Sequence, residues 1–129
     1  MTVDEAYWRR YYRVHNEARF TELVDTFYDP EAIFSNPRNE FRGRQALIDY
    51  FETAGAYVKL TLEPVEIWIK PETSATELLF TAEAKQDVPG FVTGPLKAGE
   101  TARINMAATY RMKGDRILHA SVYWGHASV

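Results

Sequence analysis

The sequence predicts an α+β domain in which three amphipathic helices precede a long, strongly bent antiparallel sheet. Apolar residues recur at helical spacing up to about residue 55, and apolar and polar residues alternate from residue 56 onward. The sheet has to wrap around the helices, because only the helices can cover its apolar face. The 129 residues contain no internal repeat and no low-complexity segment, so we expect one domain over residues 1–129.

The first helix is expected to start after Thr2, whose spacing from Glu5 is typical of a capping box. Two neighbouring stripes of large side chains follow, and they consist of Tyr7, Tyr11 and Val14 and of Trp8, Tyr12 and His15. Two such stripes are wider than a surface helix needs. We therefore expect this helix to lie across a cavity or a broad sheet.

A second helix is predicted over residues 17–27, with Asn16 as its cap, and a third helix follows Gly43. Asp29 precedes a proline, which disfavours helix, so we expect a tight turn there and a short strand over residues 32–35. The second and third helices turn these side chains inward: Phe20, Leu23, Val24, Phe27, Leu47, Tyr50, Phe51 and Ala54. The turn and short strand between the two helices create the concave space that any catalytic side chain has to reach.

Four long strands are predicted after residue 56. The first changes its alternation at Pro64, which indicates a bulge or bend, and the phase beyond the bend decides whether Glu66 and Trp68 face inward. One face of the second strand carries Leu78, Phe80, Ala82 and Ala84, and one face of the third carries Ile104, Met106, Ala108 and Tyr110. Residues 113–116 form a hairpin turn before the last strand.

The connection over residues 87–99 is long for a hairpin and unusually apolar. Hairpin loops have about 2–5 residues, whereas this one also carries Phe91, Val92 and Leu96. Two interpretations stay open. The loop is a lid over the mouth of a pocket, or it packs at a dimer interface or against the edge of the domain.

Composition excludes several classes of protein. The net charge of −3 argues against a nucleic-acid partner, and no apolar run is long enough for a membrane helix. The N-terminus shows no signal peptide, and the absence of cysteine fits the cytoplasm and excludes thiolate chemistry. Three unclustered histidines and no phosphate-binding loop lead us to expect no metal and no cofactor.

Two motifs carry a resemblance to a known family. The chain resembles the nuclear transport factor 2-like superfamily in three successive features: the segment FYDPEAIFSNP at the end of the second helix, the segment FRGRQALIDYF, and the four long strands. Order and spacing are most similar to its group of ketosteroid isomerases and SnoaL-like polyketide cyclases, over essentially the whole chain. The resemblance implies a cone-shaped barrel, with the helices closing the sheet around a deep apolar pocket. It also implies a homodimer formed through the outer face of the sheet.

The resemblance also implies positions for catalytic residues. Ketosteroid isomerases use a carboxylate base and an oxyanion hole made of a tyrosine and a protonated aspartate. The pocket tyrosine corresponds to Tyr12, the base to Asn36 and the second acid to Ala108, while Trp124 matches a pocket aromatic near the C-terminus. Related cyclases and epoxide hydrolases carry an acid on the last strand, where this chain has Val122. The pocket therefore keeps hydrogen-bonding groups but lacks the family carboxylates.

Each candidate residue also has a purely structural interpretation. Asn36 precedes a proline and suits an ordinary turn, and Tyr12 suits a core aromatic whose hydroxyl is satisfied. His15 is either a general base or a histidine at a helix end. Glu66 is the only pocket carboxylate if it faces inward, so a buried Glu66 favours an enzyme and an exposed one favours a binding protein. His126 lies either at the pocket mouth or in a tail.

The leading hypothesis is a small-molecule cyclase or isomerase of secondary metabolism that acts on an apolar, polyketide-like substrate. Tyr12 and Asn36 would polarise a substrate oxygen, and a cyclisation that needs little proton transfer, including a pericyclic one, is compatible with the missing acids. The expected pocket wall consists of Phe51, Trp68, Phe80, Phe91, Met106, Ala108, Tyr110, Val122 and Trp124. Two alternatives stay open: a non-catalytic ligand-binding or dimerisation module, and an isomerase or epoxide hydrolase whose base has moved to Glu66 or His15.

Overall fold

The computed structural model describes the backbone of residues 2–128 and the side chains of residues 2–125. The elements in chain order are α1 (Glu5–Asn16), α2 (Phe20–Phe27), β1 (Tyr28–Ser35), β2 (Glu40–Arg42), α3 (Arg44–Tyr57), β3 (Val58–Ile69), β4 (Thr73–Ala84), β5 (Thr101–Lys113) and β6 (Arg116–Ser128). The predicted α+β class is confirmed. None of the helices within residues 2–128 is long and apolar enough to cross a membrane.

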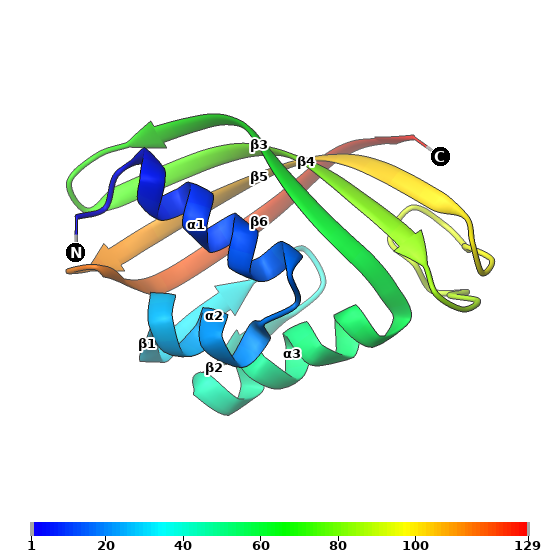
Figure 1. The fold of residues 1–129 in the computed structure, drawn as a ribbon, viewed down its shortest axis with the longest axis horizontal. Coiled ribbons are helices and arrows are strands. Elements are labelled where there is room, and N and C mark those ends of the chain that lie inside the picture. Colours follow the sequence, from blue (N-terminus) through cyan, green and yellow to red (C-terminus); the bar gives the residue numbers. More distant parts are fainter. Residues whose placement is uncertain (1, 129) are drawn as a thin grey trace.

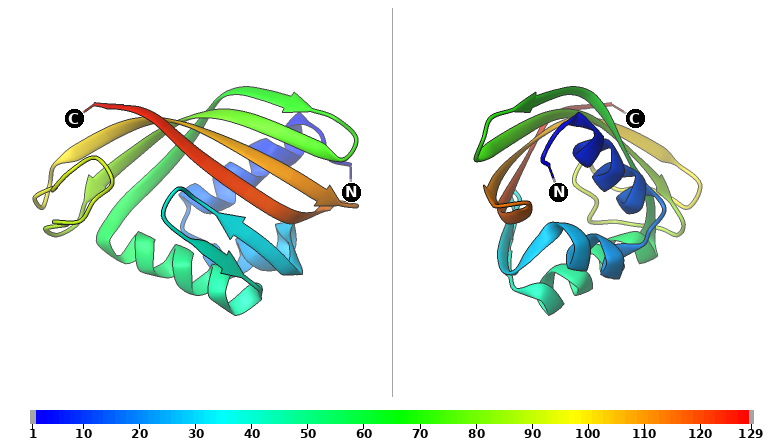
Figure 2. Two further views of the ribbon diagram at one scale, coloured as in Figure 1. Left: turned by 180° about the vertical axis from the view of Figure 1, so that it is seen from behind. Right: turned by 60° about the vertical axis from the view of Figure 1, so that its left-hand side comes forward.

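The sheet differs from the prediction in two respects. Its strand order is β2-β1-β6-β5-β4-β3, with β2 and β3 as free edges, so the sheet does not close into a barrel. It is also mixed, because β1 runs parallel to β6 while the other neighbours are antiparallel. A parallel pair requires a long connection, and here α3 and four strands separate β1 from β6. The helices lie along the concave side of the bent sheet (Figures 1 and 2).

The two stripes of α1 are both buried, as expected for a helix that crosses a broad sheet. Trp8 is fully buried and stacks on Tyr110 of β5, with ring centroids 4.2 Å apart. Asp4 rather than Thr2 caps the helix, because the carboxylate of Asp4 accepts a hydrogen bond from the backbone N–H of Tyr7. The predicted capping box is therefore wrong, while the prediction of the buried face is confirmed.

The predicted turn at Asp29 is wrong. The second helix ends at Phe27 as expected, but the chain continues directly into β1 from Tyr28. The pairing of β1 with β6 is irregular between Tyr28 and Ile33. A strand tolerates a proline at such an irregularity, because the missing N–H breaks no ladder hydrogen bond.

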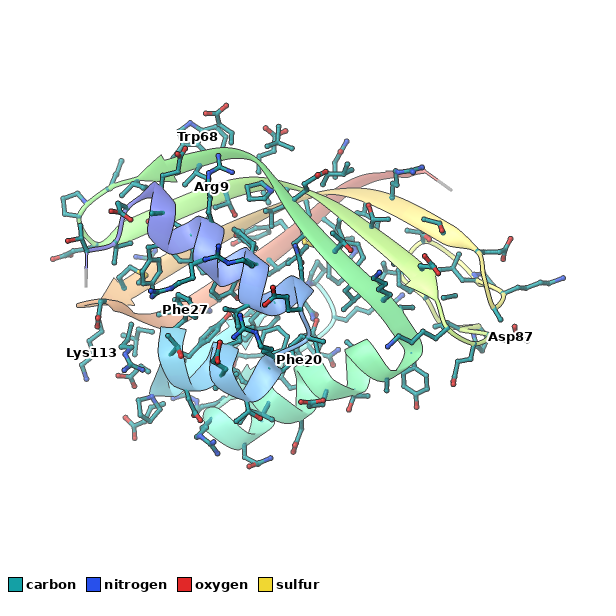
Figure 3. The ribbon with its side chains drawn as sticks, viewed as in Figure 1. Arg9, Phe20, Phe27, Trp68, Asp87 and Lys113 are labelled. Carbon is teal, nitrogen blue, oxygen red and sulfur yellow. The ribbon has the colours of Figure 1, made fainter. Side chains whose placement is uncertain are left out.

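The predicted bulge in β3 is confirmed, and beyond it Glu66 and Trp68 are exposed. Pro64 pairs with Leu78 and Glu66 with Glu77, so one extra residue lies between the two pairs. Glu66 is exposed, and 54% of Trp68 is accessible on the outer side of β3 (Figure 3). Glu66 and Trp68 are therefore not pocket residues, and the predictions that placed them there are wrong.

Candidate active site

A cavity of about 340 Å³ lies between the concave face of the sheet, α1, α3 and the loop that follows β4. This volume is near the lower end of the range of roughly 300–1,000 Å³ that is usual for small-molecule sites. Apart from Trp68, all predicted wall residues line the cavity: Phe51, Phe80, Phe91, Met106, Ala108, Tyr110, Val122 and Trp124. Their contact with a ligand stays a prediction.

The loop between β4 and β5 forms part of the cavity wall. Val88, Phe91 and Val92 line the cavity, and Val88 pairs with Leu96, which is buried against the domain. Across the mouth, the Arg38 guanidinium donates a hydrogen bond to the carbonyl oxygen of Gly90 at 3.1 Å. The loop therefore borders the cavity, and its role as a lid stays a prediction.

His15 lines the cavity from the C-terminal end of α1 and is only 4% exposed. Its Nδ1 lies 3.0 Å from Oδ1 of Asn16. The Asn16 amide is oriented by the backbone of Leu62, because Oδ1 accepts from the Leu62 N–H and Nδ2 donates to the Leu62 carbonyl, both at 2.9 Å. Since Oδ1 is an acceptor, Nδ1 of His15 carries the proton, and we assign the free lone pair to Nε2.

The surroundings of His15 favour its neutral form. Burial lowers the pKa of the imidazole from its ordinary value of 6.5, and the hydrogen bond to Asn16 opposes this shift only in part. A neutral imidazole with a free lone pair on Nε2 is a proton acceptor at neutral pH. Asn16, predicted as the cap of the second helix, instead holds His15 in this tautomer.

The assignment predicts how His15 titrates. We expect the pKa of His15 to lie below 6.5, with the proton of the neutral ring on Nδ1, in nitrogen-15 NMR spectra of labelled protein. Because the unfolded chain then binds more protons, the free energy of unfolding should fall as the pH drops from 6.5 toward the folded-state pKa. The His15→Gln variant should lack this component. A measured pKa of 6.5 or higher would contradict the assignment.

Tyr11 and Tyr110 are two of the tyrosines that line the cavity, whereas Tyr12 does not line it. The Tyr12 hydroxyl lies 2.7 Å from Thr76 Oγ1 and 2.9 Å from the Tyr110 hydroxyl. Burial raises the pKa of all three tyrosines above its ordinary value, so their hydroxyls stay protonated and remain hydrogen-bond donors. Tyr12 therefore contacts Tyr110 without lining the cavity, and its expected role in polarising a substrate oxygen stays a prediction.

Asn36 forms a turn rather than part of the cavity wall. Its Oδ1 accepts hydrogen bonds from the backbone N–H groups of Arg38 and Asn39, at 2.9 and 2.8 Å. Its Nδ2 donates to the hydroxyl of Tyr50 at 3.3 Å, and Tyr50 does line the cavity. Asparagine is common at such positions because its side chain satisfies the N–H groups of the turn.

The polar groups of the cavity are few. Among the described residues, no carboxylate lines the cavity and no three metal-ligating side chains come together. His119 lies outside the cavity, where its Nε2 is 3.2 Å from Ser35 Oγ, and the side chain of His126 lies outside the described part.

Tyr11 could have been identified from the sequence, because it shares a helix face with His15 four residues later. No spacing in the sequence indicated that Arg38 lines the cavity.

Comparison with known proteins identifies relatives of this architecture. The model of the SnoaL-like domain matches residues 8–120. No curated protein matches the chain. Among solved structures, a SnoaL-like polyketide cyclase from Agrobacterium tumefaciens is 19% identical, with a TM-score of 0.79 over 97% of this chain and 93% of that one. The epoxide hydrolase/cyclase-like enzyme SalBIII, described in pyran ring formation in the polyether salinomycin, is 18% identical, with a TM-score of 0.75 over 94% and 89%.

A protein with a ketosteroid isomerase-like fold from Catenulispora acidiphila, solved in complex with trimethylamine, is 12% identical to the chain. Its TM-score is 0.74, over 96% of this chain and 88% of that one. At these identities the likeness to solved structures shows a shared fold.

Proposed function

This chain belongs to the SnoaL-like domain family, and on that premise we propose that it is an enzyme that isomerises or cyclises an apolar, polyketide-like small molecule with His15 as its base. The observation that carries the proposal is the contact between Nδ1 of His15 and Oδ1 of Asn16, from which we assign the tautomer of His15. Its Nε2 is unprotonated in a cavity whose described lining is otherwise apolar or phenolic, apart from Arg38 at the mouth. The names of the structural neighbours, a polyketide cyclase and an epoxide hydrolase/cyclase-like enzyme, support this class of reaction.

The reaction would begin at a carbon atom next to a carbonyl group. Nε2 of His15 takes the proton from this carbon, and the electron pair of the C–H bond moves to the carbonyl oxygen. Protonated phenols donate hydrogen bonds to the resulting enolate oxygen, and we assign this role to Tyr11 and Tyr110, two of the tyrosines that line the same cavity. In an isomerisation the imidazolium then returns the proton to another carbon. In a cyclisation the enolate carbon forms a bond to the carbon of a second carbonyl group, the π electron pair of that group moves to its oxygen, and this oxygen takes the proton from the imidazolium.

A second function, binding without catalysis, is supported by the exposed side chain of Glu66. With Glu66 outside, no carboxylate remains among the described lining residues. A binding protein of this fold needs the apolar wall but not the base. The two functions differ in one respect that can be tested, since only an enzyme changes the molecule that it binds.

Native mass spectrometry of the protein from its own host tests the proposal. We expect an apolar metabolite to be retained in the cavity, and incubation of that metabolite with fresh protein to give an isomer of the same mass. An unchanged metabolite would favour the binding function. The same spectrum gives the mass of the assembly and so tests the homodimer expected from the resemblance. The cytoplasmic location stays a prediction.

A further inference from the structure

We propose that Arg38 binds an anionic group of the ligand at the mouth of the cavity, so that the substrate is an organic acid with an apolar body and a carboxylate at one end. This inference rests on the proposed function, because it assigns the chemical class of the molecule that the cavity takes. Arg38 differs from the other described residues of the cavity wall in its permanent positive charge. Arg38 is the only lysine or arginine among the described lining residues.

The positive charge of Arg38 is not neutralised by the protein. Within residues 2–125, no aspartate or glutamate lies within ion-pair distance of Arg38, whereas Arg44 pairs with Asp25 and Arg19 pairs with Glu22. Among the described residues, the guanidinium of Arg38 donates one side-chain hydrogen bond, to the Gly90 carbonyl. A guanidinium group has five N–H donors in a planar fork that matches a carboxylate. Donors are therefore left for an anion beside the lid.

The backbone holds Arg38 where such an anion would enter. Asn36 accepts hydrogen bonds from the N–H groups of Arg38 and Asn39, so these hydrogen bonds hold the tip of the turn between β1 and β2. From this turn the guanidinium reaches Gly90 on the opposite rim. A carboxylate bound to the same guanidinium would hold the ligand between the turn that carries Arg38 and the loop that carries Gly90. The apolar body would then lie against the cavity wall, with His15 on a different element, α1.

Isothermal titration calorimetry with two probes tests the inference: the naphthoate anion and the uncharged naphthamide, which have the same ring system. We expect the wild-type protein to bind naphthoate about 5- to 10-fold more tightly, as suits a charge-assisted contact at a partly exposed site. In Arg38→Gln the two probes should bind equally, with the affinity for naphthamide unchanged. Arg38→Lys should keep part of the preference, because it keeps the charge without the fork.

Arg42→Gln is the matched control, because Arg42 is an exposed arginine of the neighbouring strand β2 that does not line the cavity. This variant should keep the full preference for naphthoate. If naphthamide binds but the wild type shows no preference, or if Arg38→Gln keeps it, the role of Arg38 is refuted and the proposed function stands. If neither probe binds the wild type, the small-molecule cavity itself is refuted, and the role of Arg38 with it.

Discussion

Replacing His15 by glutamine is expected to lower the rate of proton abstraction in the cavity by about 100-fold or more, since a positioned general base contributes roughly 10²–10⁴-fold. A nitrobenzisoxazole measures this step without the natural substrate. A base removes the proton on its ring carbon, the N–O bond breaks, and a coloured nitrophenolate forms. The wild-type rate should be constant above pH 6.5 and fall only below it, because burial lowers the pKa of His15.

His119→Gln is the control for the His15 variant. His119 is a histidine of β6 whose Nε2 contacts Ser35 and Ser121 outside the cavity. Its replacement should leave the rate unchanged, and thermal unfolding should show that both variants are folded. A His15→Gln variant that retains the wild-type rate would refute the assignment of His15 as the base.

Replacing Trp8 by alanine is expected to lower the free energy of unfolding by about 3–5 kcal/mol, the usual range for removing a buried tryptophan. Trp8 is wholly enclosed: it stacks on Tyr110 and contacts the edges of Tyr7 and Tyr11. Most of the cavity left behind would be lined by rings that cannot collapse into it. Since domains are stable by about 5–15 kcal/mol, urea denaturation should show a much lower midpoint. Tyr11 and Tyr110 also line the ligand cavity, so binding should weaken as well.

Two further variants separate ring volume from the indole N–H. The Nε1 of Trp8 is buried and has no hydrogen-bond partner among the described residues. Trp8→Phe therefore removes an unpaired donor while keeping an aromatic ring, and we expect it to lose far less stability than alanine. Trp68→Ala removes a tryptophan that is 54% exposed, so the change should stay within about 0.5 kcal/mol. Equal losses for Trp8→Ala and Trp68→Ala would contradict this account of the core.

Much of the architecture could be predicted from local pattern alone. The spacing of Trp8 and Tyr11 shows that α1 has two apolar stripes, and both are buried. The change of phase at Pro64 places the bulge of β3 correctly. These predictions succeed because helical and strand periods depend on neighbouring residues. They decide which side chains share a face, whatever that face later contacts.

The parts that failed depend on what a face is packed against. The phase at Pro64 does not say that Glu66 turns outward, because that depends on the pairing of β3 with β4. The resemblance predicts a catalytic position for Asn36, yet the side chain of Asn36 is hydrogen-bonded within its own turn. Similarly, the parallel pairing of β1 with β6 depends on a connection that spans most of the chain.

The sequence by itself determined the fold class, the buried faces and part of the apolar wall. Only the tertiary structure decided which polar groups serve the cavity. The tautomer of His15 depends on Asn16 and, through it, on the backbone of Leu62, which is 46 residues away from Asn16. Arg38 reaches the mouth only because Gly90, 52 residues further along the chain, lies opposite. Contacts at such separations have no sequence period, since they arise when whole elements pack against one another.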